Sequence, residues 1–206
     1  MIRNKKELDF YIMADRMMNT GRFKQPLIRK LIDIINPDYM MRFLVLMRQY
    51  QYYKHQRGLG SLMGLYYKLR YKRLSVKLGF TIDPDAFEYG LSIPHYGTIV
   101  VGSPAQIGKY AVLQTNVCIS GNGKIIGDAL YMATGAKITS KVILGDNVTV
   151  GANAVVNKSY GGGNVLLVGV PAQPKAEASP WYIKAGGVYK ERVDEIEQLK
   201  IDMRLS

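Results

Sequence analysis

The sequence is poor in the residues that bind metals or form cross-links. It has one cysteine, Cys118, and two histidines, His55 and His95, among 206 residues. A single cysteine excludes an intrachain disulfide, and so few Cys and His residues give no cluster of the kind that binds zinc. We therefore expect no metal site, and a reducing compartment fits.

Long apolar runs are also absent. The run Phe43–Met47 is closed by Arg42 and Arg48, far short of the roughly 18–20 residues that span a bilayer. The first ten residues contain no apolar segment of signal-peptide length. These absences predict a cytoplasmic protein. Peripheral contact with the inner face of the membrane stays an alternative.

Positive charge gathers in the first part of the chain. Residues 1–80 hold 17 Lys and Arg against 5 Asp and Glu, whereas residues 81–206 hold 11 of each, so the net charge of +12 lies entirely in the first part. This charge suits solvated helix faces, peripheral docking on an anionic membrane or an acidic glycan, or nucleic-acid binding. Because no recognition motif accompanies the charge, we expect no nucleic-acid partner.

The hydrophobic pattern divides the chain into three parts. Before residue 79, apolar residues at three- and four-residue spacings predict helices, and Pro37 with Asp38 suits a helix start. Residues 188–205 predict a closing amphipathic helix. The predicted parts are a basic α-helical region (1–80), a repeat domain (81–175) and a C-terminal tail with a helix (176–206).

Aliphatic residues recur at every sixth position through the repeat domain, with one extra residue near the middle. The position after each is usually Gly or Ala, and the position four after it is also modest in size. Nine or more hexads in near-unbroken phase predict the hexapeptide repeat of a parallel β-helix. The aliphatic series is Val101, Ile107, Leu113, Ile119, Ile126, Met132, Ile138, Leu144, Val150 and Val156.

Three six-residue strands with tight corners close a triangular coil of about 18 residues. Each aliphatic side chain then points inward and stacks on its equivalent one coil away, at roughly 4.8 Å. The extra residue falls in 120–125 and predicts a short loop there. The fold class that follows is mainly β: a left-handed parallel β-helix with an α-helical N-terminal region and a C-terminal helix.

The segments "HYGTIVVG", "GAKI", "GANAVVNK" and "GVPAQP" resemble those of the hexapeptide-repeat acyltransferases, and most of all the serine acetyltransferases. The run "LGFTIDPDAFEYGLSIPHYGTIVV" is similar to a serine-acetyltransferase-like branch found in bacterial surface-polysaccharide gene clusters. The resemblance covers about residues 75–175. It implies a left-handed β-helix, a homotrimer, and acetyl transfer from acetyl-CoA to a hydroxyl.

His95 is the main catalytic candidate. It lies six residues before Val101, in phase with the inward series. It is either a hydrogen-bonded structural residue or the general base that deprotonates the acceptor hydroxyl, a role that suits imidazole near neutral pH. The resemblance implies the catalytic role. A metal ligand is disfavoured because the repeat domain has no second histidine.

A general base of this kind usually has a carboxylate that orients it. In serine acetyltransferases an Asp stands 15 residues before the His, and here that position is Phe80, or Thr81 if one residue is missing. We select Asp85 as the partner, and a backbone carbonyl is the alternative. The nearby carboxylates are Asp83, Asp85 and Glu88.

Two departures from the serine acetyltransferases concern the acceptor. Pro94 stands where those enzymes have an Asp that helps hold the amino acid, and the loop 120–125 lacks the Arg-His pair that grips the serine carboxylate. A zwitterion would therefore lack charged partners. We expect a neutral sugar hydroxyl instead.

The resemblance also implies residues that hold acetyl-CoA. Small coil corners at Thr134 and Ala152 would let backbone amides approach the pantetheine arm, and Asn157 and Lys158 would lie near the CoA phosphates. Gly121, in the loop, would offer a backbone N–H to the thioester oxyanion. The alternative is that Thr134 and Ala152 are only tolerated at the corners and that Lys158 is only solvated.

These observations predict an acetyl-CoA-dependent O-acetyltransferase that acts on a sugar or glycan intermediate, in surface polysaccharide synthesis. Transfer would be direct, because Cys118 has no obvious activating neighbour in the sequence. Two alternatives stay open: a serine O-acetyltransferase of cysteine synthesis, and a non-catalytic β-helix scaffold.

Overall fold

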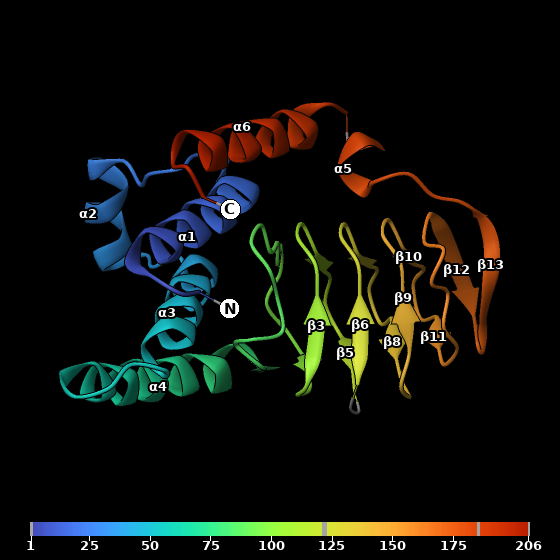
Figure 1. The fold of residues 1–206 in the computed structure, drawn as a ribbon, viewed down its shortest axis with the longest axis horizontal. Coiled ribbons are helices and arrows are strands. Elements are labelled where there is room, and N and C mark those ends of the chain that lie inside the picture. Colours follow the sequence, from blue (N-terminus) through green and yellow to red (C-terminus); the bar gives the residue numbers. More distant parts are fainter. Residues whose placement is uncertain (1, 121–122, 185, 206) are drawn as a thin grey trace.

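A block of helices sits at one end of a parallel β-helix in the computed structural model, which describes residues 2–120, 123–184 and 186–205. Figure 1 shows the coils stacked side by side along the long axis, with a C-terminal helix running back over them to the helical block. The predicted fold class is confirmed. None of the described helices is both long and apolar enough to cross a membrane.

The helices begin and end at residues suited to those positions. Asp38 is the N-cap of the third helix and its carboxylate accepts a hydrogen bond from the amide of Met41 at 3.0 Å, which confirms the predicted start. Gly21 and Gly79 end the first and fourth helices with positive φ angles of 70° and 77°. The helices are α1 (Lys5–Thr20), α2 (Leu27–Ile35), α3 (Tyr39–Tyr53), α4 (Leu59–Leu78), α5 (Trp181–Lys184) and α6 (Val188–Asp202).

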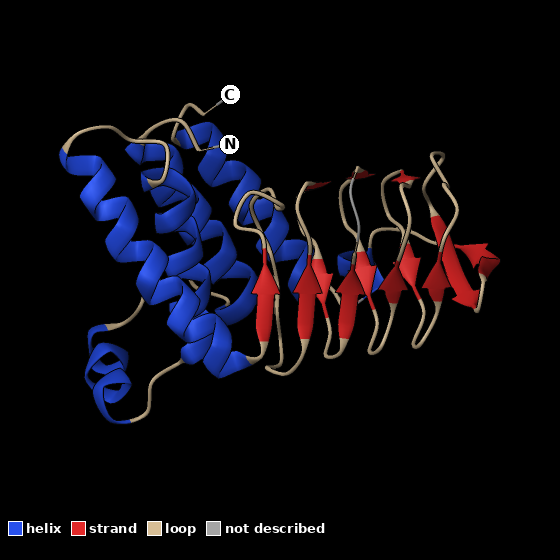
Figure 2. Ribbon diagram, turned by 90° about the horizontal axis from the view of Figure 1, so that it is seen from below, coloured by secondary structure: helices blue, strands red, loops and turns tan. Residues whose placement is uncertain are grey.

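The coils form three sheets, one on each side of a triangular prism, and Figure 2 shows their strands in parallel rows. All pairings between coils are parallel, and only the last strand, β13, runs antiparallel to its neighbour β12. The first sheet holds β1 (Phe80–Ile82), β2 (Ile99–Val101), β5 (Val117–Ile119), β8 (Lys137–Ile138) and β11 (Val155–Val156). The second holds β4 (Val112–Leu113), β7 (Tyr131–Met132), β10 (Thr149–Val150), β12 (Val165–Gly169) and β13 (Ala172–Glu177). The third holds β3 (Ala105–Ile107), β6 (Lys124–Ile126) and β9 (Ile143–Leu144).

The predicted hexad series fills the interior of the prism. All ten aliphatic residues from Val101 to Val156 are 3% exposed or less. The extra residue is also where the sequence predicted it: Ile107 pairs with Ile126 across the coils, and the step from Ile119 to Ile126 is seven positions rather than six. Burying the stacked aliphatic side chains is what stabilises coils that could not bury their faces singly.

The C-terminal helix α6 returns to the helical block and packs on α1. Tyr89 and Tyr110, which lie in the first two coils, both donate from their hydroxyls to Oε1 of Glu197 in α6, at 3.0 and 2.5 Å. Burial is the main cause that raises the pKa of both tyrosines well above their ordinary range. The hydrogen bond to Glu197 and its negative charge raise the pKa further. The guanidinium of Arg192 also donates to the carbonyl of Met18, at 2.8 Å.

A buried ion pair joins the helical block to the first coil. Nε of Arg48 (α3) lies 2.7 Å from Oδ2 of Asp15 (α1), and both side chains are almost fully buried. Arg48 also donates to the carbonyls of Phe87 and Glu88, at 2.8 and 2.7 Å. Asp15 accepts from the backbone amides at positions 90 and 91. Several hydrogen bonds satisfy each charge, although burial still raises the pKa of Asp15 above its ordinary value.

Replacing Asp15 with Asn is expected to lower the free energy of unfolding by about 3–5 kcal/mol, because Arg48 would be left as an uncompensated buried charge. Urea denaturation followed by circular dichroism measures the change. Asp194→Asn is the matched control, since it breaks the exposed Lys190–Asp194 pair and should change stability by about 0.5 kcal/mol at most. Equal effects of the two variants would contradict the structural role of the buried pair.

Candidate functional site

His95 lies at an enlarged corner of the first coil. Ser92 bridges to Val112, which aligns Ile93 with Leu113, and Val101 pairs with Ile119. Leu113 and Ile119 are six positions apart, whereas Ile93 and Val101 are eight apart. The first coil therefore has two extra residues here, and they place His95 on the surface. The prediction that His95 continues the inward series is wrong: it is exposed, and Ile93 takes the inward position.

The enlarged corner leaves the imidazole and its neighbour in solvent. His95 has no hydrogen bond to any residue in the described part of the chain. Tyr96 is 74% exposed, and sequence reasoning did not select it. Gly97 has φ of 134°, a conformation that side chains rarely adopt, so this glycine is required for the turn.

Helix α1 holds the backbone directly before His95. The side-chain amide of Asn19 donates to the carbonyl of Leu91 at 2.8 Å, and its oxygen accepts from the amide of Ile93 at 3.1 Å and from the Ser92 hydroxyl at 3.3 Å. Asp15, one helical turn earlier, accepts from the amide of Leu91 at 3.0 Å. Two side chains of one helix face therefore fix the chain that leads into the corner.

The corners of successive coils form a column that begins at His95. The amide of Gly135 donates to the carbonyl of Thr115 at 3.0 Å, and the amide of Asn153 donates to the carbonyl of Thr134 at 3.0 Å. A Cβ on Gly97 would lie 3.6 Å from the Thr115 side chain. The corner segments in the column are 94–98, 114–116, 133–135 and 151–153.

The column brings together three of the predicted site residues, His95, Thr134 and Ala152. Thr134 and Ala152 are exposed at equivalent positions of neighbouring coils. Ala152 lies three coils beyond His95, which is about 14 Å at the ordinary strand spacing. An extended ligand lying along this column would contact all three.

Two other predicted site residues, Asn157 and Lys158, lie at a different corner, beyond the ends of the strands of the sheet β1-β2-β5-β8-β11. Asn157 and Lys158 follow β11 and are exposed. Gly121 lies outside the described residues. The loop next to it is held by Lys124, a buried lysine whose Nζ donates to the carbonyl of Ser120. Burial lowers the pKa of Lys124.

Asp85 is not brought to His95 within one chain. It follows β1, whereas His95 precedes the parallel strand β2, so the two lie at opposite ends of paired strands. Its carboxylate pairs with Nζ of Lys54 at the end of α3, and Nε2 of His55 lies 3.9 Å away. Asp85 and His95 are therefore not paired within one chain, and Asp85 as the partner of His95 stays a prediction.

The stacked hexads and the parallel register place the chain in the class of hexapeptide-repeat β-helix proteins. Within this class, the chain is similar to serine acetyltransferases. The serine acetyltransferase of Mycobacterium tuberculosis is 28% identical over 121 residues, 55% of this chain and 51% of that protein. The serine acetyltransferase of Helicobacter pylori is 34% identical over 86 residues, 38% of this chain and 50% of that protein. The resemblance to serine acetyltransferases is thereby confirmed. No protein-family model matches the chain.

Solved structures share the fold. The soybean serine acetyltransferase in complex with serine superimposes with a TM-score of 0.60 at 17% identity, covering 82% of this chain and 70% of that one. The enzyme of Brucella abortus gives 0.59 at 23% identity, covering 85% and 69%. A serine acetyltransferase in complex with CoA gives 0.53 at 17% identity, covering 82% and 68%.

The chain spans about half the length of the curated relatives it matches. These relatives are named serine acetyltransferases, so the comparisons favour the serine alternative over the predicted sugar acceptor. They give no support for a role in polysaccharide synthesis.

Asn19→Ala is expected to loosen the corner that carries His95, because it removes three hydrogen bonds to residues 91–93. Hydrogen exchange should become at least tenfold faster at the amide of Ile93, while the coils from β7 onward keep their protection. Thr20→Ala is the matched control, since the Thr20 hydroxyl bonds only the carbonyls of Arg16 and Arg22. Unchanged exchange in the Asn19 variant would show that α1 does not position the corner.

Proposed function

We propose that the protein is an acetyl-CoA-dependent O-acetyltransferase with His95 as its general base. The observation that carries the proposal is the column of corners, which aligns an exposed imidazole with the small exposed corners at Thr134 and Ala152. The similarity to serine acetyltransferases supplies the reaction class. A solved relative in complex with CoA supports acetyl-CoA as the donor.

The proposed reaction is a direct transfer. The imidazole of His95 takes the proton of the acceptor hydroxyl as its oxygen attacks the thioester carbon of acetyl-CoA. The carbon–sulfur bond then breaks, and the imidazolium returns the proton to the CoA sulfur. Acetyl-CoA would lie along the column past Thr134 and Ala152, with its thioester at the His95 end. A backbone N–H at Gly121, which lies outside the described residues, is the proposed partner of the thioester oxyanion.

The site is proposed to be completed by a second subunit of a homotrimer. His95 lacks a hydrogen-bond partner among the described residues of its own chain, and Asp85, Asn157 and Lys158 lie at the next corner of the prism. Packing of three prisms would bring one chain's corner against a neighbour's. In that arrangement a neighbouring Lys158 would contact the CoA phosphates.

Serine is the first acceptor to consider, because the similar proteins are named serine acetyltransferases and one was solved with serine. A sugar hydroxyl is the second candidate, and it rests on two features of the sequence. Pro94 stands at the position where serine acetyltransferases have an Asp, and the segment 120–125 has neither Arg nor His. A zwitterion would therefore meet few charges of opposite sign.

His95→Asn is expected to lower kcat/KM for acetyl transfer by about 10² to 10⁴. The melting temperature should not change, because the side chain is exposed and has no described partner. Thiol release from acetyl-CoA measures the rate. His55→Asn is the matched control and should retain activity. Full activity of the His95 variant would contradict its role as general base, and the absence of thioester cleavage in the wild type would favour the scaffold alternative.

The two acceptors can be separated by restoring the missing carboxylate. If serine is the acceptor, Pro94→Asp should lower the KM for serine about tenfold, because it supplies a charge to the ammonium group. Pro94→Asn controls for the backbone change. Thiol release is compared with serine and with neutral amino sugars and hexoses. Turnover of a sugar together with no response to serine in either variant would instead identify the sugar as acceptor.

A further inference from the structure

Helix α2 is a short amphipathic helix that stands away from the rest of the molecule. Figures 1 and 2 show it projecting at the outer end of the helical block. At 100° per residue its aliphatic side chains fall on one arc of roughly 160°, with Arg29 and Asp33 outside it. All are between 43% and 90% exposed. They are Leu27, Ile28, Leu31, Ile32, Ile34 and Ile35.

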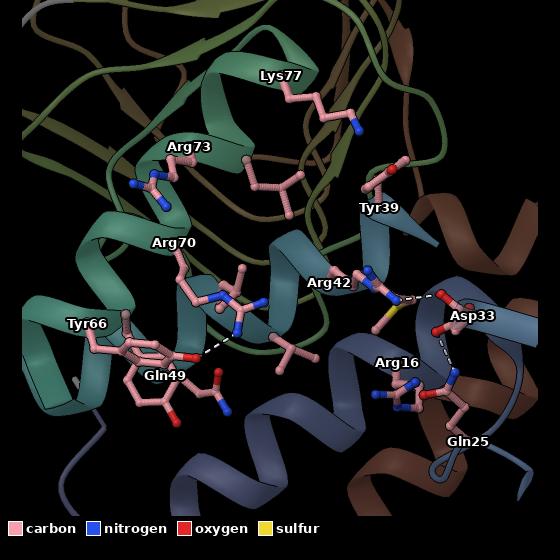
Figure 3. A pocket seen from close by; sticks show the side chains of 15 residues that line it. Arg16, Gln25, Asp33, Tyr39, Arg42, Gln49, Tyr66, Arg70, Arg73 and Lys77 are labelled. Atoms are coloured by element: carbon pink, nitrogen blue, oxygen red, sulfur yellow. Dashed lines mark hydrogen bonds between the residues drawn. The ribbon is translucent and has the colours of Figure 1, made fainter. Parts of the chain in front are cut away.

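A groove of about 610 Å³ opens beside α2. Its lining comes from α1 and α3, from α4 along one side, and from the segment around α2 along the other. Figure 3 shows basic side chains from several of these elements around one space. The cations that line it are Arg16, Arg42, Arg70, Arg73 and Lys77.

The positive charge of this groove is poorly compensated within the described chain. Asp33 is the one carboxylate among its lining residues. That carboxylate already accepts from Nε2 of Gln25 at 2.7 Å and lies 3.5 Å from Nε of Arg29. Arg42 donates to the Asp33 carbonyl, and Arg70 to the hydroxyl of Tyr66, both at 2.6 Å, so neither bond neutralises a charge.

Exposed apolar side chains also occur on α4, a helix that lines the groove. Leu62, Leu65 and Leu69 of α4 are each more than half exposed. The same helix carries Arg70 and Arg73, which line the groove. Exposed apolar surface on this scale marks an interaction site. The helices α2 and α4 thus each contribute charged or polar residues to the groove and carry exposed apolar residues that do not line it.

We propose that this face of the helical region docks on an anionic phospholipid surface, with α2 lying in the interface and a lipid phosphate in the groove. Cations beside an apolar helix are the combination that binds anionic membranes, because neither buried apolar area nor charge alone is sufficient for a helix this short. A second copy of the chain fits less well. Two copies meeting at this face would bring two basic grooves together.

The lowered pKa of Arg16 agrees with this proposal. Arg16 is half-buried at the inner end of the groove, and burial lowers its pKa although Asp38 and Asp33 oppose the effect. A phosphate in the groove would offset that unfavourable burial of charge.

The test is co-sedimentation of the full chain with vesicles. Binding is expected to phosphatidylcholine vesicles that contain phosphatidylglycerol, with at least tenfold weaker binding to phosphatidylcholine alone and a loss on raising the salt concentration. Inorganic phosphate at millimolar concentration should compete only weakly, which separates a lipid headgroup from a free phosphate. Equal binding to both vesicles, or to neither, would overturn the proposal.

Two double variants test the two parts of the surface. Ile34→Asn with Ile35→Asn removes apolar area from α2, and Arg70→Gln with Arg73→Gln removes charge from the groove. Each is expected to weaken binding about tenfold or more. The matched controls are Val170→Asn with Ile201→Asn, and Lys175→Gln with Arg204→Gln, which change exposed residues far from this face in the sequence. Controls that weaken binding equally would overturn the proposal.

A measurement of mass in solution tests the alternative that a second copy of this chain covers the face. If the α2 variant changes the oligomeric state and the wild type does not bind vesicles, the face is an interface between copies of this chain and the membrane proposal is wrong. Circular dichroism melting of each variant shows whether the fold is retained. Because the readout is binding, its failure would leave the proposed acetyl transfer untouched.

Discussion

The pairing of Asp15 with Arg48 is the interaction on which the arrangement of this molecule depends. It is buried and has hydrogen bonds from α1, from α3 and from the backbone of the first coil. A charge in that position tolerates little displacement, because each lost partner leaves a polar atom without water. The helical block and the β-helix are therefore held in one orientation, and the chain around His95 is fixed from outside the repeats. Without the helices the first coil would end in a long unsupported corner.

The two halves of the site differ in what holds them. Thr134 and Ala152 are set by the repeat itself, since any residue at those places in a hexad falls at the same corner. His95 is set by an interruption of the repeat and by the side chain of Asn19. In the proposed reaction the regular stack would hold the extended donor, and the irregular first coil would carry the general base.

Much of the fold could be predicted from the sequence because hexads carry their geometry locally. The inward aliphatic series, the extra residue after Ile119 and the helix start at Asp38 follow from spacing and residue type alone. The exposure of His95 could not be predicted by counting back from Val101, because the two extra residues have no compositional mark. The pairing of Asp85 with Lys54 joins positions 31 apart, and no local pattern reports on such a contact. The burial of Lys124 was also missed, although its partner Ser120 is only four residues away.

The packing of α6 on α1 has a consequence for the order in which contacts form during synthesis. During synthesis every coil leaves the ribosome before α6 does, so the aromatic cluster around Glu197 and the contact of Arg192 with Met18 are the last to form. Until then α1 has an uncovered apolar side. A nascent chain therefore exposes the apolar side of α1 until α6 has been synthesised, and a holdase that shields α1 during translation would act when premature association is the greatest hazard.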